Sequence, residues 1–220
     1  MKFLYKLIRI IISIFLLPFC LGSVVALWQI VLMSGKAETI WTTVLVGVLC
    51  WILIYLFLPE PKWAYVFGHE LTHALWSWFF GGKLKKFKVG SSGGHVSITK
   101  SNFLVSLAPY FFPMYVVIVV IIYMIGNFFW NWTPYVSWFY FLIGTMYAFH
   151  VTLTYRILKI KQPDIVHEGY IFSTVIIFLG NMCILLIGIP LLTTKISVSA
   201  SLNLWINYSI QIYHYVLQIV

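Results

Sequence analysis

The sequence predicts an all-α polytopic membrane protein with about six transmembrane helices and one small β-hairpin. The first observation is composition, since 62% of the residues are hydrophobic and only 9% are charged, against about 25% charged in soluble domains. The second is that apolar runs of about 18 residues or more recur, each long enough to cross the roughly 30 Å hydrocarbon layer as a helix. The third is one short segment of alternating apolar and polar residues. We therefore expect a single membrane-embedded domain over residues 1–220.

The expected spans are six apolar segments, at about residues 7–33, 39–58, 63–81, 102–125, 137–158 and 170–192. The N-terminal stretch resembles a signal peptide, but its apolar character continues to Met33, so we expect a retained first membrane helix. The tail 197–220 contains no Lys, Arg, Asp or Glu. This composition favours an interfacial helix, with a seventh span as the alternative.

The alternating segment lies between the third and fourth expected spans, in "KLKKFKVGSSGGHVSITK". Phe87 and Val89 flank Lys88, and Val96 and Ile98 alternate with polar residues around a Gly- and Ser-rich turn. This pattern predicts a β-hairpin that pairs about 84–89 with 95–100. A solvated basic loop between helices is the alternative.

The basic residues account for a net charge of +9 and lie mainly at the ends of apolar runs and in the hairpin. Positive-inside topology explains this placement better than nucleic-acid binding, which we do not expect. The hairpin side of a six-span topology carries nine Lys and Arg against five on the other side, so we expect the hairpin to face the cytoplasm. The cysteines Cys20, Cys50 and Cys183 are scattered through apolar runs and predict neither a disulfide framework nor a metal site.

The chemistry is concentrated in "FGHELTHALW", residues 67–76, where His69, Glu70 and His73 interrupt an apolar segment. On a helix, positions i and i+4 share a face, so both imidazoles can bind one zinc ion with Glu70 beside it as general base. Zinc lowers the pKa of a bound water towards neutrality and polarises a carbonyl. The alternative is a satisfied polar cluster in a bundle core, but ionisable groups within a membrane are costly and usually functional.

A catalytic zinc needs a third protein ligand. Asp164 is the only aspartate of the chain, in "KIKQPDIVHEGY" between the fifth and sixth expected spans, and is the favoured ligand. Glu168 and His167, within one helical turn of it, are alternatives. In the alternative interpretation, Asp164 is not a metal ligand and only caps the sixth expected helix.

Two further polar residues lie within expected spans. His150 is either a hydrogen-bonded core residue or a residue of the site, and Asn181 either positions substrate or forms an interhelical hydrogen bond. An aromatic cluster in the connection opposite the hairpin is typical of a membrane-interface belt; it comprises Trp130, Trp132, Tyr135 and Trp138.

The segment "GHELTHALWSWFFGG" followed by a short hairpin resembles the site-2-protease type of intramembrane zinc metalloprotease. In that family an Asp of a later membrane segment is the third ligand, usually in an N-x-x-P-x-x-x-x-D-G-like stretch. "QPDIVHEGY" is similar in part, because Pro163 directly precedes Asp164 and the glycine follows five residues later as Gly169. The resemblance covers about residues 63–110 and, more loosely, 160–181. It implies a catalytic core at about 60–192, preceded by N-terminal helices over 1–58.

The resemblance implies an intramembrane zinc endopeptidase that cleaves a transmembrane or juxtamembrane segment of another membrane protein, as in regulated intramembrane proteolysis. Its zinc ligands would be His69, His73 and Asp164, and Glu70 its general base. A helical substrate must be extended before attack, and a strand edge can hold it through backbone pairing. We therefore expect substrate contacts from Val96 and Ile98 of the hairpin. Asn181 and His150, the polar residues within later spans, are further expected substrate contacts.

The expected partners are a membrane-protein substrate and the lipid bilayer. Because the sequence shows no substrate-recruiting domain, selection depends on the hairpin, the helices or a partner subunit. The expected location is a cell membrane, of prokaryotic type, with the active site towards the cytoplasm. The alternatives are a non-proteolytic scaffold or assembly factor that keeps the fold, and a transporter or metal carrier, which would require more polar residues along the spans than the sequence has.

Overall fold

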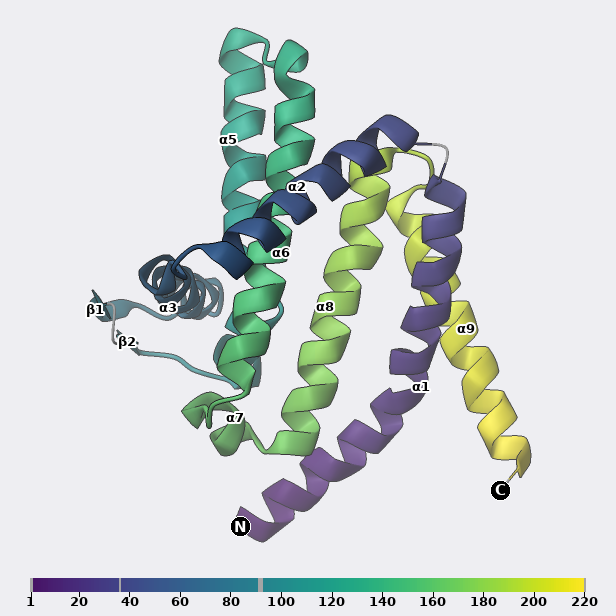
Figure 1. Cartoon of the computed structure of the whole chain (residues 1–220). Coiled ribbons are helices and arrows are strands. Elements are labelled where there is room, and N and C mark those ends of the chain that lie inside the picture. Colours follow the sequence, from purple (N-terminus) through teal and green to yellow (C-terminus); the bar gives the residue numbers. More distant parts are fainter. Residues whose placement is uncertain (1, 36, 91–92, 220) are drawn as a thin grey trace. The chain divides into compact units, whose positions relative to one another are not determined.

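The computed structural model describes residues 2–35, 37–90 and 93–219 (Figure 1). The chain forms two compact units, which we describe separately: Met1–Glu38 with Pro163–Val220, and Thr39–Gln162. Both units consist mainly of long apolar helices, as expected for a membrane protein.

The first unit contains α1 (Lys2–Ser34), α7 (Pro163–Glu168), α8 (Tyr170–Thr193) and α9 (Val198–Ile219). Helix α1 packs against both α8 and α9. The backbones of α1 and α9 approach closely at Gly22, where an added Cβ would lie 2.3 Å from Ser209 Oγ. Trp205 Nε1 donates a hydrogen bond to the carbonyl oxygen of Phe19 at 2.8 Å. The C-terminal tail is thus a helix docked along α1, and it is not among the helices apolar enough to span a membrane.

The second unit contains α2 (Glu38–Phe57), α3 (Lys62–Phe79), α4 (Phe103–Leu107), η1 (Ala108–Tyr110), α5 (Met114–Trp130), η2 (Thr133–Tyr135) and α6 (Val136–Leu158), together with two strands. Helices α2 and α6 meet through glycines: a Cβ added to Gly47 would lie 2.1 Å from Phe141 O, and one added to Gly144 would lie 2.1 Å from Val44 O. Small residues at such crossings let membrane helices pack closely. The hydrophobic core of this unit is formed by Trp51, Tyr65, Ala148, Phe149 and Leu153.

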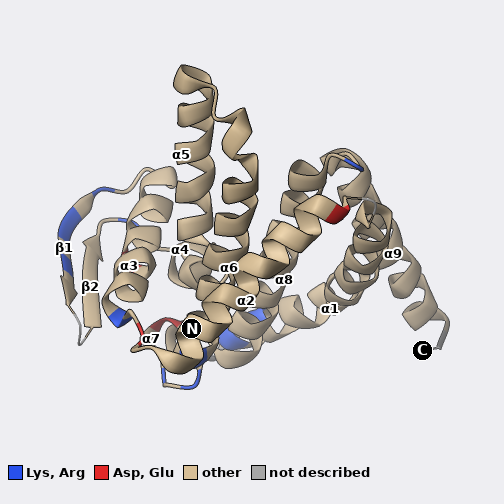
Figure 2. Ribbon diagram, turned by 45° about the horizontal axis from the view of Figure 1, so that its top comes forward, with Lys and Arg blue, Asp and Glu red and all other residues tan. Residues whose placement is uncertain are grey.

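The predicted hairpin is confirmed. Strands β1 (Leu84–Gly90) and β2 (Gly93–Ile98) are antiparallel, with Phe87 opposite Val96 and an irregularity between Leu84 and Lys86. Lysines make β1 strongly basic (Figure 2), while the Phe87 ring packs edge-on against Phe67 of α3 at 5.8 Å. The central turn residues, 91 and 92, lie outside the described residues.

The six-span count is not confirmed. Among the described residues, four helices are long and apolar enough to cross a membrane: Leu4–Ser34, Glu38–Phe57, Thr133–Leu158 and Tyr170–Thr193. A fifth span results if Phe103–Tyr110 and Met114–Trp130, bent by 81°, are counted together.

Both departures from the expected spans have a physical cause. The expected third span forms helix α3, but its two histidines and one glutamate lower its hydropathy. The expected fourth span, at about 102–125, is broken near Pro109 and Pro113, because proline lacks the N–H that continues a helix.

Candidate metal centre

The H-E-x-x-H motif lies on α3 within the second unit, and its two imidazoles lie side by side. The ring centroids of His69 and His73 are 4.9 Å apart, and one ligand nitrogen of each ring lies within 4.8 Å of the other. His73 and Glu70 are buried, whereas His69 is half-buried. The four-residue spacing thus places both rings on the same face of α3, so His69 and His73 are two residues that would hold one ion.

His73 is oriented by a backbone carbonyl. Its Nδ1 lies 2.8 Å from the carbonyl oxygen of Val105 in α4, and because a carbonyl only accepts, Nδ1 carries the proton. The other nitrogen, Nε2, then keeps the lone pair that binds a metal. Helix α4 is itself held by Asn102, whose side chain accepts a hydrogen bond from Val105 N at 2.9 Å. Sequence reasoning missed Val105, because a backbone acceptor leaves no trace in residue type.

The broken helix supports the motif helix. Val105, Leu107, Ala108 and Tyr110 have no exposed surface, and α3 packs against α4, η1 and α5. Non-helical backbone within a membrane occurs only where protein buries it or where it lines a cavity. The irregular segment is thus a buried support beside the two histidines.

Glycine lets α5 approach the motif helix closely. A Cβ added to Gly68 would lie 2.7 Å from Tyr115 Cε2, and the Tyr115 hydroxyl donates a hydrogen bond to Ala64 O. The helix that carries the motif is therefore fixed from this side by both packing and a hydrogen bond.

A small cavity lies beside His69. Tyr65, Thr72 and Tyr115 contribute to its lining, and His150 from α6 completes it next to His69. His150 is 7% exposed, and its Nε2 has no hydrogen-bond partner among the described residues. The structure therefore brings one predicted substrate-contact residue, His150, to the same cavity as a motif histidine.

Strand β2 crosses the Glu70 carboxylate. A Cβ added to Gly94 would lie 2.6 Å from Glu70 Cγ and 3.0 Å from Glu70 Oε1, so the strand can pass this close only because residue 94 has no side chain. Alternation along a strand places Val96 and Ile98 on the same face as Gly94. Both are half-buried, and they extend the strand surface that begins above Glu70.

The remaining predicted residues belong to the first unit. Asp164 is the second residue of α7. Glu168, an alternative third ligand, is 3% exposed and has both carboxylate oxygens engaged: Oε2 pairs with Arg9, and Oε1 lies 2.9 Å from His167 Nδ1. Asn181 donates to the carbonyl oxygen of Ile177 on its own helix at 2.9 Å. Its expected role in substrate positioning stays a prediction.

The donor atoms of the candidate residues are of types that zinc binds. His69, His73 and Asp164 each offer one atom that can bind a metal, and two imidazoles with a carboxylate are a common set for catalytic zinc. The tautomer fixed at His73 and the carboxylate of Glu70 on the same helix agree with such a site.

No protein-family model, curated protein or solved structure matches this chain. The resemblance to site-2 proteases therefore rests on the sequence motifs described above.

Proposed function

We propose that this protein is an intramembrane zinc endopeptidase that hydrolyses a peptide bond in a transmembrane or juxtamembrane segment of another membrane protein. One observation carries the proposal. The side-by-side histidines of α3, with His73 oriented by a backbone carbonyl, flank a glutamate that lies directly under an exposed hairpin.

His69 and His73, with the sequence-predicted Asp164, would hold the metal. When bound, zinc supplies Lewis-acid chemistry, lowering the pKa of a coordinated water and polarising a carbonyl. Glu70 takes the proton from the attacking water and returns it to the leaving amine, as a general base that then acts as an acid.

Strand β2 supports the choice of a peptide substrate. The structure describes only a two-stranded sheet, so the β2 edge that does not face β1 can pair with an extended segment. Because β2 crosses Glu70 at Gly94, a segment paired there would run past the carboxylate. Val96 and Ile98 would contact its side chains.

The decisive experiment replaces Glu70 by Gln and measures cleavage of a co-expressed membrane substrate, with zinc content measured in parallel. Loss of the general base is expected to reduce cleavage by about 10²-fold or more while one zinc per chain is retained. Glu38→Gln, a change of an exposed glutamate at the start of α2, serves as the matched control. Replacing His69 and His73 together by Ala should remove the zinc.

Full biological activity of the Glu70→Gln variant would contradict the enzymatic mechanism and favour the non-proteolytic scaffold. Absence of zinc from the purified wild-type protein would overturn the metal centre itself.

A further inference from the structure

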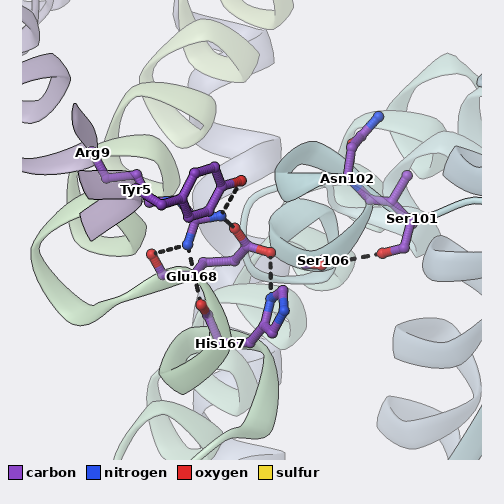
Figure 3. A network of polar contacts seen from close by, with 8 residues as sticks. Tyr5, Arg9, Ser101, Asn102, Ser106, His167 and Glu168 are labelled. Atoms are coloured by element: carbon purple, nitrogen blue, oxygen red, sulfur yellow. Dashed lines mark hydrogen bonds and ion pairs between the residues drawn. The ribbon is translucent and has the colours of Figure 1, made fainter. Parts of the chain in front are cut away.

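A buried arginine in α1 holds the C-terminal end of α7. Arg9 is 8% exposed and lies within the apolar helix Leu4–Ser34. Its Nη1 donates to the backbone oxygens of His167 at 3.1 Å and Glu168 at 2.7 Å. Its Nη2 donates to the Tyr5 hydroxyl at 3.0 Å and pairs with the Glu168 carboxylate (Figure 3). The guanidinium also lies over the rings of Tyr5 and Phe172, with centroid distances of 4.2 and 5.3 Å.

This arrangement is specific to arginine. A planar guanidinium presents several N–H donors in a fixed fork, so it can bind two carbonyl oxygens and a carboxylate together. The two carbonyls belong to His167 and Glu168, at the C-terminal end of α7. The chain then turns at Gly169, where φ is +92°. Arg9 therefore fixes both the end of α7 and the turn that joins it to α8.

Stability alone is a weak explanation for this ion pair. Charged side chains inside a membrane are costly, and replacing a buried ion pair by apolar residues is often neutral or stabilising. The Glu168 carboxylate, moreover, uses its second oxygen to contact His167 Nδ1 at 2.9 Å. Both charged groups are therefore used in full to hold the end of α7.

We propose that Arg9 and Glu168 are positioning residues that fix the orientation of Asp164 for zinc binding. Helix α7 has six residues, from Pro163 to Glu168, and Asp164 precedes Glu168 by one helical turn on the same face. The contacts of Arg9 with Glu168 thus fix the helix backbone that carries the Asp164 side chain. This inference rests on the proposed function, and it makes the N-terminal helix part of the machinery that orders a metal ligand.

The test compares the variants Arg9→Met and Arg9→Lys. Lys6→Met is the matched control, because Lys6 is an exposed, positively charged residue of the same helix. Two quantities are measured on the full-length protein in detergent. One is the zinc Kd from chelator competition, and the other is amide hydrogen exchange over residues 163–173 of the metal-free protein. Loss of partners outside the metal shell typically weakens metal binding by about 10–100-fold. We expect a shift of that size, with faster exchange, for Arg9→Met, a smaller shift for Arg9→Lys, and none for Lys6→Met.

Arg9→Met alone would leave the Glu168 carboxylate buried without its cation, and this variant can fail to fold for that reason. The double variant Arg9→Met/Glu168→Gln removes this unpaired charge as well. We expect it to fold and still to bind zinc about tenfold more weakly than the wild type. A folded double variant with the wild-type Kd and wild-type exchange would overturn the inference while leaving the protease intact. A wild-type protein that binds no zinc would instead overturn the proposed function, and the positioning role with it.

Discussion

Replacing Gly94 by Ala would insert a methyl group where β2 crosses Glu70. The added carbon would lie 2.6 Å from Glu70 Cγ, 2.7 Å from Val66 Cγ1 and 3.0 Å from Glu70 Oε1. Two of these three contacts are far shorter than the 3.5–4.0 Å at which carbon atoms pack best. Either the hairpin must lift away from α3, or the side chains of Glu70 and Val66 must both turn away, by about 1 Å in each case.

The two consequences differ in size. Overpacking of this kind typically lowers the free energy of unfolding by about 1–3 kcal/mol. A displacement of about 1 Å at a reacting group, in contrast, can reduce the rate by about 10²-fold. We therefore expect Gly94→Ala to fold and bind zinc but to cleave the co-expressed substrate about 10²-fold more slowly.

Gly90→Ala provides the matched control in the same hairpin. Its added Cβ would meet only Gly93 O, at an ordinary 3.5 Å, so cleavage should stay near the wild-type rate. The assay follows substrate and product in membranes over time, with zinc content and thermal unfolding measured on the same preparations. If Gly94→Ala cleaved as fast as Gly90→Ala, the placement of β2 over a catalytic carboxylate would be refuted.

Two further predictions concern stability, measured by thermal unfolding in detergent micelles. Gly169 has φ +92° and nothing within 4 Å of an added Cβ, so Gly169→Ala should lower the free energy of unfolding by about 1–3 kcal/mol through backbone strain alone. Gly188 also has open space around an added Cβ but an ordinary helical conformation, so Gly188→Ala should be neutral or stabilising. Equal effects of the two changes would contradict this reasoning. Trp51 is 5% exposed and donates a hydrogen bond from Nε1 to Thr152 Oγ1 at 2.8 Å, so Trp51→Phe should lower the free energy of unfolding by about 1–3 kcal/mol. Trp28→Phe, at a 63% exposed position, should change this free energy little. An unchanged unfolding temperature for Trp51→Phe would argue against this hydrogen bond.

The elements that the sequence predicted well depend on local spacing. The four-residue separation of His69 and His73 places both rings on one helical face whatever surrounds them, and the structure brings them together. Alternation around glycines similarly predicted the hairpin, whose strands form with Phe87 opposite Val96. Composition alone indicated a membrane protein.

The number of spans was predicted less accurately, because a search for apolar segments takes no account of functional polar residues or of breaks in a helix. The expected span at 63–81 carries the polar motif that lowers its apolarity, and the one at 102–125 bends by 81° between two helices. Pro109 and Pro113 were visible signals of that break, although not of its packing against the motif helix.

Composition by itself indicated the membrane class, and residue identity and spacing predicted the H-E-x-x-H helix and the hairpin, because helices and hairpins follow from interactions between near neighbours. Only the tertiary structure decided what surrounds them. His73 is oriented by a carbonyl 32 residues away, and Arg9 binds α7 across 159 residues. Gly94 lets a strand cross Glu70. The carbonyl oxygens that bind His73 and Arg9 belong to the backbone, which is the same for almost every residue type, and a glycine does not reveal which segment will lie against it. Such contacts arise only when folding brings distant segments together.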